Sequence, residues 1–325
     1  MENAFDKPLV TISMVTYNQE NYIRESIRSV LSQTYEPLEI VISDDHSTDR
    51  TWEIILEEID HYRRTNGVHK KFVLNRNETN LGIARNCNIA ASLHHGLLYV
   101  ANDGDDISFP NRVERIVEEW NKTGRCASVV THDGIKIDRH GREIGTVGQR
   151  GIQCPLGAVM TFSSSVINDF EGIQEIDSYV DHVYARRGGL LGTELFINEK
   201  LLKYRVGSGT SSVLYSRRQP ELRAAKGRMA SYCQSLHDID LFLQKKILNE
   251  SRYLELRKEY ESKVCENEHI IELLSDSRFI DRWKAYRKLY LSGRIGFSAF
   301  LRFPYLLPRK LGDLCYWLYG CLKNG

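Results

Sequence analysis

Near its N-terminus the chain reads Leu9-Val10-Thr11-Ile12-Ser13-Met14-Val15-Thr16-Tyr17-Asn18. The first seven of these residues are mostly apolar or β-branched, which predicts a buried strand that ends in a polar loop. Residues 23–31 carry apolar side chains at the spacing of a helix, and residues 38–42 repeat the strand pattern. The chain is therefore expected to begin as strand, helix and strand.

The same alternation continues over the first hundred residues. Residues 47–49 (Ser-Thr-Asp) are good N-cap residues for a second helix. The inward-facing residues of that helix are expected to be Trp52, Ile55, Leu56 and Ile59. Short strands are expected at residues 71–74 and 97–101, with a small-residue helix at 82–93 between them. This spacing favours an α/β fold with a mostly parallel central sheet covered on both faces.

Beyond residue 106 the pattern is looser. Pro110 is typical of the first turn of a helix, whose apolar face is expected to consist of Val113, Ile116, Val117 and Trp120. A strand is expected at 127–131, a hairpin at 135–144, and a mobile, glycine-rich loop at 145–157. Residues 221–274 have an almost continuous helical pattern, which predicts a helical extension after the sheet.

Length and composition limit the class of protein. The chain has 325 residues, of which 42% are hydrophobic and 27% are charged, as expected for a folded protein of about two domains. No apolar run approaches the ~20 residues that a transmembrane helix needs, and the first residues do not resemble a secretory signal. The seven cysteines include no C-x-x-C pair, which favours packing thiols in a reducing compartment.

Polar clusters follow three of the expected strands. They are Thr16-Tyr17-Asn18, Asp44-Asp45 and Asp103-Gly104-Asp105-Asp106. Ligands of open parallel sheets bind at the carboxyl ends of the strands, so we expect these clusters to share one edge of the sheet. The alternative for each cluster is a helix cap, an interpretation that three clusters together make less attractive.

The acidic cluster at 103–106 predicts a divalent cation. Three carboxylates within four residues repel one another unless a cation or hydrogen-bond donors lie between them. A hard cation that also binds phosphate oxygens suits such a group. Neither the glycine-rich turn of a dinucleotide fold nor a P-loop follows the first strand. The remaining interpretation is nucleotide binding in which a metal neutralises the diphosphate.

Five motifs occur in an order and spacing that identify a family. They are Val10–Asn18, Ser29–Thr34, Glu39–Asp49, Asn80–Asn86 and Asp103–Asp106. Over roughly residues 8–215 the chain resembles the family 2 glycosyltransferases of the GT-A fold. The resemblance implies a Rossmann-like sheet and an inverting transfer of a sugar from a nucleotide diphosphate sugar, most simply a UDP-sugar, with Mg²⁺ or Mn²⁺.

The resemblance also implies roles for single residues. The residues that would line the base and ribose pocket are Thr16, Tyr17 and Asn18. Asp45 would hydrogen-bond the nucleobase, and Arg85 would lie near the nucleotide. Asp103 and Asp105 match the family's D-x-D motif, so Asp105 would bind the metal directly and Asp103 would be shared between ribose and metal.

The general base of the family is the Asp of a Glu-Asp pair downstream of D-x-D. Asp181 aligns with it, although Val180 replaces the Glu, and Asp177 is the alternative base. The stretch Phe196–Gly207 resembles the family's closing strand and its Tyr-Arg loop, with glycine where histidine is common. Polymerising members carry Gln-x-x-Arg-Trp, whereas Phe279–Trp283 lacks the glutamine, so single addition is favoured.

These observations predict a GT-A domain at residues 1–215 and a helical extension at 216–325. The domain would hold a nucleotide-sugar half at about 1–108 and an acceptor half at about 109–215. The predicted function is transfer of one sugar to a hydroxyl of a lipid-linked or surface glycan. The alternatives are a nucleotidyltransferase of related fold and a non-catalytic glycan- or nucleotide-binding protein. The former usually has a basic, glycine-rich loop after its first strand, which is missing from the sequence.

The C-terminal residues differ in character from the rest. Residues 282–325 contain nine Lys or Arg and one acid, Asp313, a net charge of +8, whereas the whole chain has +1. Aromatic residues are interleaved with these cations from Trp283 to Tyr319, and no nucleic-acid-binding motif accompanies them. We expect short amphipathic pieces on an anionic membrane, at the inner face of the plasma membrane. The alternative is a helix that folds back onto the acidic remainder of the chain.

Overall fold

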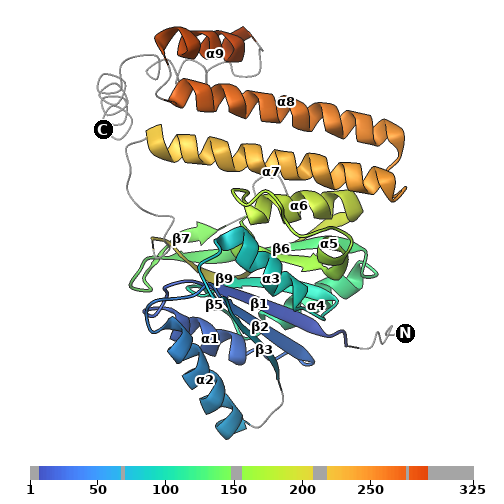
Figure 1. Ribbon diagram of the computed structural model, residues 1–325. Coiled ribbons are helices and arrows are strands. Elements are labelled where there is room, and N and C mark those ends of the chain that lie inside the picture. Colours follow the sequence, from blue (N-terminus) through green and yellow to red (C-terminus); the bar gives the residue numbers. More distant parts are fainter. Residues whose placement is uncertain (1–6, 67–69, 148–155, 208–217, 276–277, 292–325) are drawn as a thin grey trace. The chain divides into compact units, whose positions relative to one another are not determined.

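The computed structural model describes residues 7–66, 70–147, 156–207, 218–275 and 278–291. The chain divides into two compact units, one of residues 1–176 and 180–212 and one of residues 177–179 and 213–325. The first unit holds the sheet and the second holds the long helices (Figure 1). In the described part of the chain, no helix has both the length and the apolar character needed to cross a bilayer.

One mixed sheet of nine strands forms the first unit, as far as the structure describes it. Along the sheet the order is β3-β2-β1-β4-β8-β6-β9-β5, with β7 paired to β6. The strands are β1 (Val10–Thr16), β2 (Leu38–Asp44), β3 (Lys71–Arg76), β4 (Leu98–Asp103), β5 (Ile107–Ser108), β6 (Ala127–Ile137), β7 (Glu143–Val147), β8 (Met160–Ser163) and β9 (Thr193–Arg205). Strands β3, β2, β1 and β4 are parallel neighbours, as the alternating pattern predicted. β8 is inserted antiparallel between β4 and β6, which the sequence did not predict.

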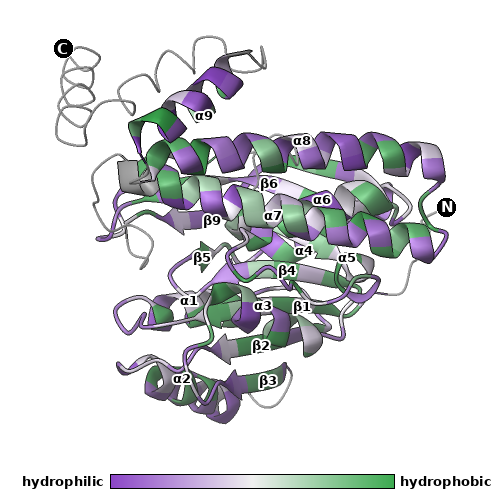
Figure 2. Cartoon of the chain, turned by 45° about the horizontal axis from the view of Figure 1, so that its top comes forward, coloured by the Kyte–Doolittle hydropathy of each residue, from purple (hydrophilic) through white to green (hydrophobic). Residues whose placement is uncertain are grey.

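Helices cover both faces of this sheet. They are α1 (Ile23–Leu31), α2 (Thr51–Asn66), α3 (Ile83–Ser92), α4 (Arg112–Lys122), α5 (Ser164–Asn168) and α6 (Val180–Leu191). One core joins α1, α2 and α4 to side chains such as Ile12 and Val100, and a second joins α3, α5 and α6 to side chains such as Tyr99 and Phe162. Successive strand residues point to opposite faces, so Tyr99 and Val100 enter different cores. Figure 2 shows the hydrophobic character of β1 and β2.

Most helices lie where periodicity predicted them, and α2 shows one error. Leu56 is exposed, whereas Ile54 is buried. The buried side of α2 also includes Glu58, whose carboxylate pairs with Arg28 of α1 at 2.7 Å. The buried face of α2 therefore includes Ile54 and Glu58 and leaves Leu56 on the solvent side. The predicted hairpin is present as β6 and β7, and most of the predicted mobile loop, residues 148–155, lies outside the described residues.

The second unit consists of α7 (Arg218–Gln244), α8 (Glu250–Leu274) and α9 (Phe279–Leu291) among the described residues. The predicted continuous helical region is thus two helices. The chain reverses between α7 and α8, where Lys246 has a φ of 58° and Asn249 caps α8 by accepting a hydrogen bond from the Arg252 amide. The core of the unit contains Ala225 of α7, Leu273 of α8 and Leu289 of α9.

Candidate active site

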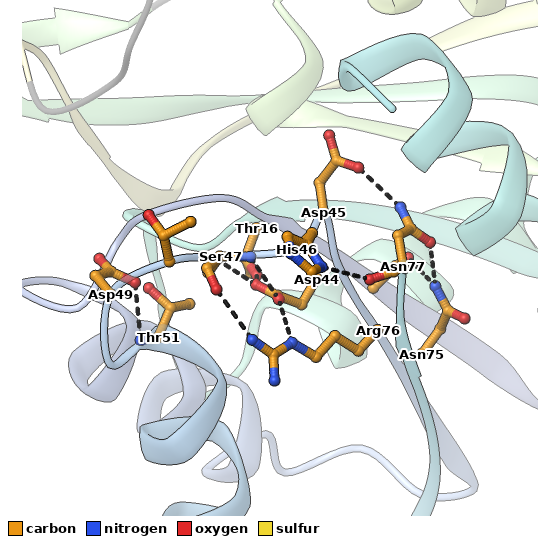
Figure 3. A network of polar contacts seen from close by, with 12 residues as sticks. Thr16, Asp44, Asp45, His46, Ser47, Asp49, Thr51, Asn75, Arg76 and Asn77 are labelled. Carbon is orange, nitrogen blue, oxygen red and sulfur yellow. Dashed lines mark hydrogen bonds and ion pairs between the residues drawn. The ribbon is translucent and has the colours of Figure 1, made fainter. Parts of the chain in front are cut away.

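The loop after β1 is fixed to the loop after β2 by polar side chains (Figure 3). The Thr16 hydroxyl donates to Asp44 Oδ1 at 3.0 Å, and the Asp45 amide donates to the Thr16 carbonyl at 2.9 Å. Asn18 has a φ of 52°, and its side-chain oxygen accepts a hydrogen bond from the Thr48 amide at 2.8 Å. Tyr17 is partly exposed beside it. Two of the three predicted polar clusters therefore share one edge of the sheet.

Asp44 and Asp45 have different roles in this loop. Asp44 is buried and accepts hydrogen bonds from Thr16 and Ser47. Its Oδ2 also forms an ion pair with Arg76 Nε at 3.5 Å (Figure 3). Asp45 accepts hydrogen bonds from Asn77 Nδ2 at 2.8 Å and from the amides of residues 81 and 82 at 2.8 and 2.9 Å. Both Asp45 carboxylate oxygens thus bind the segment that leads into α3. Its contact with a nucleobase stays a prediction.

The acidic turn begins where β4 ends. Carboxylate oxygens of Asp103, Asp105 and Asp106 lie within 4.8 Å of one another. Burial and the charge of Asp105 raise the pKa of Asp103 to about 7. Burial and the charges of Asp103 and Asp105 raise the pKa of Asp106 well above its ordinary value. Gly104 permits this turn because an added Cβ would lie 2.8 Å from Thr16 Cγ2 and even closer to Gln19 Oε1. The acidic turn therefore packs against the loop after β1.

Two buried arginines hold the acidic turn, and motif reading did not assign them a role in the site. The Arg205 amide donates to Asp106 Oδ1 at 2.9 Å, and its guanidinium donates to the Asp105 carbonyl at 3.0 Å and to Glu25 at 2.7 Å. Arg112 of α4 donates to Ser108 Oγ at 2.9 Å and to the carbonyls of residues 101 and 158 at 3.0 and 2.7 Å. The only sequence signals were the Tyr-Arg resemblance for Arg205 and the start of a helix for Arg112.

Arg112 also fixes the protonation of a buried histidine. Its Nε donates to His132 Nε2 at 3.0 Å, and His132 Nδ1 donates to the Asp133 carbonyl at 2.7 Å. Burial and the neighbouring guanidinium lower the pKa of His132 to about 3, so the ring is neutral at pH 7. Burial lowers the pKa of Arg112 to about 10, which still leaves a positive charge near Asp103 and Asp106 at neutral pH.

Asp181 lies in the first turn of α6. Its charge is near enough to raise the pKa of Asp103. Burial raises the pKa of Asp181 itself, and hydrogen bonds from the amides of His182 and Gly157 oppose that rise. The side chain remains partly exposed. A carboxylate with a raised pKa and access to solvent is a candidate general base.

The remaining predicted residues lie on different elements. The thiol of Cys87 lies on α3. Burial raises its pKa most, and the charges of Asp103, Asp181 and Asp45 raise it further. Arg85 is exposed on the same helix. Asp177, the alternative base, is exposed and belongs to the second unit.

The acidic turn has the donor set of a hard divalent cation. It offers three clustered carboxylates, and Asp106 Oδ2 is a buried oxygen without a hydrogen-bond partner among the described residues. Carboxylate oxygens are the ligands that Mg²⁺ and Mn²⁺ prefer. A cation there would neutralise the repulsion that raises the pKa values of Asp103 and Asp106. The residues present therefore fit a divalent metal.

Comparison with known proteins assigns the class. Residues 11–164 match the sequence model described as Glycosyl transferase family 2. A Haemophilus influenzae protein named as an uncharacterized glycosyltransferase is 27% identical over 278 residues, which cover 79% of this chain and 81% of that protein. The fold is of the GT-A type, and the resemblance to family 2 glycosyltransferases is confirmed over residues 11–164.

Two solved structures illustrate the shared fold. S. aureus TarS 1-349 in complex with UDP-GlcNAc has a TM-score of 0.56 and 18% identity, covering 88% of this chain and 92% of that one. The mannosyltransferase PcManGT from Pyrobaculum calidifontis, in complex with GDP-Man and Mn²⁺, has a TM-score of 0.56 and 15% identity, covering 91% of this chain and 79% of that one. The likeness confirms the predicted fold class.

Proposed function

We propose that this glycosyltransferase moves one sugar from a UDP-sugar to an acceptor hydroxyl, with inversion and with Mg²⁺ or Mn²⁺ bound at Asp105 and Asp103. The observation that carries the proposal is the cluster of three carboxylates within 4.8 Å of one another at the end of β4, and the effect of the Asp181 charge on the pKa of Asp103 supports Asp181 as the base. A base and a metal site on the same edge of the sheet suit attack on a sugar whose leaving group is a diphosphate.

Different residues of the chain would have different roles in this reaction. Asp181 would remove the proton of the acceptor hydroxyl as its oxygen attacks the anomeric carbon from the face opposite the diphosphate, a contribution of typically about 10²–10⁴-fold. A divalent cation bound at the acidic turn would supply Lewis-acid stabilisation of the leaving diphosphate. Arg112 and Arg205 would hold the turn in place through the contacts they make to the backbone around it.

The donor half of the site consists of the loops after β1 and β2. Thr16, Tyr17, Asn18 and Asp45 lie there, and Arg85 is exposed on the neighbouring α3. Structural neighbours were solved with UDP-GlcNAc and with GDP-Man, which supports a nucleotide sugar as donor. UDP is the nucleotide that we propose.

The proposed base is tested by Asp181→Asn. The variant keeps the size of the side chain but cannot accept the proton, so turnover should fall by about 10²-fold or more while UDP still binds. The measurement is release of UDP from a panel of UDP-sugars with Mn²⁺, beside the thermal shift caused by UDP. Asp177→Asn is the matched control and should keep wild-type turnover.

The same assay separates the alternatives. Release of UDP supports sugar transfer, release of pyrophosphate would support nucleotidyl transfer, and binding without release of either would support a non-catalytic protein. Near-normal UDP release by Asp181→Asn, with loss of activity in Asp177→Asn, would move the base to Asp177 and contradict the proposed assignment.

The acceptor that we propose is a lipid-linked or surface glycan under assembly at the cytoplasmic face of the plasma membrane. The basic and aromatic character of residues 282–325 supports this location, because it suits peripheral contact with anionic lipid. A catalytic unit held at that surface would meet a lipid-linked acceptor in two dimensions.

A further inference from the structure

Among the described residues, helix α9 packs against the core of its unit with one side. Ala285 and Leu289, four residues apart, are buried in the core that also contains Leu273 and Leu274 of α8. Residues at this spacing lie on one face of a helix. Within the described part of the chain, the opposite side of α9 therefore has no part in that core.

The outward side of α9 is unusually rich in large apolar side chains. Phe279, Trp283 and Tyr290 fall within a narrow arc of the helix, because they are four and seven residues apart, and Ile280 lies next to them. The exposed fractions are 59% for Phe279, 57% for Ile280, 45% for Trp283 and 64% for Tyr290. We call these four residues the aromatic face of α9.

Positive charge borders the aromatic face. Lys284, Arg287 and Lys288 are exposed on the same helix, and Asp281 is its acidic residue, bound to Arg278 at 3.0 Å. The chain continues after α9 with further Lys and Arg, and residues 282–325 carry nine cations against one acid. The structure of residues 292–325 lies outside the described part. Charge complementarity thus favours an anionic occupant for this side of α9.

We propose that the aromatic face of α9 is a docking surface for an anionic lipid bilayer. Trp and Tyr side chains suit the headgroup boundary, where an apolar ring is buried and a polar atom stays wet. The bordering cations match the negative surface of anionic lipid. A second copy of the chain would bring these cations against one another, which is why lipid is the better occupant. The inference rests on the proposed function in so far as a membrane acceptor gives the docking its purpose.

Flotation of the full chain with liposomes tests the docking surface. Vesicles of phosphatidylcholine with phosphatidylglycerol should carry the protein at low salt, and vesicles of phosphatidylcholine alone should not. Trp283→Ser should reduce binding at least about tenfold, since it removes a large ring that would be buried in the lipid. Lys284→Gln/Lys288→Gln should weaken binding about 30-fold, at about 1 kcal/mol per cation.

Matched control variants lie on the other helices of the same unit. Leu254 of α8 has an exposed fraction of 58%, and Lys226 and Lys258 are exposed on α7 and α8. Leu254→Ser and Lys226→Gln/Lys258→Gln should float like the wild type. Circular dichroism of every variant checks that the helices are retained.

Several outcomes would overturn the inference. Flotation that ignores anionic lipid, or that survives Trp283→Ser and the double lysine variant, would show that the face does not bind a bilayer. A dimer in sedimentation that Trp283→Ser dissociates would assign the face to a second copy. UDP release is measured without vesicles, so the two proposals can fail separately. A wild-type chain that releases UDP but does not float with anionic vesicles contradicts this inference alone. A wild-type chain that floats but releases no UDP contradicts the proposed function alone.

Discussion

At the scale of single residues, the proposed metal ligand Asp105 and its neighbours lead us to expect that donor binding depends on a metal. The three carboxylates of the acidic turn lie within 4.8 Å of one another, so a diphosphate cannot approach them without a cation between. UDP should therefore raise the unfolding temperature only when Mn²⁺ or Mg²⁺ is present. Asp105→Ala should abolish this rise in unfolding temperature. In the wild type the rise reflects about 2.7 kcal/mol of added unfolding free energy for a ligand at 100 times its Kd. An equally large shift in EDTA would contradict the metal assignment.

Asp106 provides the complementary test on stability. Its pKa is raised, as is that of Asp103, which reaches about 7 from 3.8. A carboxyl group whose pKa is raised in the folded protein binds its proton more tightly there than in the unfolded chain. The metal-free protein should therefore lose stability as the pH rises from about 4 to about 7. Asp106→Asn should raise the metal-free stability at pH 7, because it removes one charge from the repelling cluster, and should reduce this pH dependence. Unfolding in urea at pH 5 and pH 7 measures both, and a destabilised variant with an unchanged pH profile would contradict the repulsion argument.

At the scale of elements, α4 is joined to β4, β6 and the segment before β8 by the single side chain of Arg112. Arg112→Lys keeps the charge but loses the fork of donors. It should cost about 3 kcal/mol, because one ammonium cannot reach all the buried acceptors of Arg112 and each acceptor left unpaired costs about 1–3 kcal/mol. Arg115→Lys on the same helix is the control, because its partners are partly exposed and such pairs contribute at most about 1 kcal/mol. Equal midpoints for the two variants in urea unfolding would refute the role of Arg112.

The elements also show what could be predicted from the sequence. Helix α1 and strands β1, β2 and β4 were predictable because their apolar periodicity is local. The insertion of β8 beside β4 was not, since a four-residue strand has too short a pattern and its partner is distant in sequence. Arg112 and His132 were missed for the same reason: a charged or polar residue becomes part of the site only through burial, which depends on the whole fold. The clustering of Asp103, Asp105 and Asp106 was predictable because they lie within four residues of one another in the sequence.

At the scale of the whole molecule, the donor site and the α7–α9 helices belong to separate compact units. Donor binding should therefore be sensed by one unit only. Hydrogen–deuterium exchange of the full chain with UDP and Mn²⁺ should protect the loops around Thr16, Asp45 and Asp103, because a ligand across these loops ties together strand ends that otherwise open locally. Exchange in α7 and α8 should stay unchanged. Protection spread equally over both units would mean that the helices respond to the donor, and a donor site confined to the sheet unit would then be wrong.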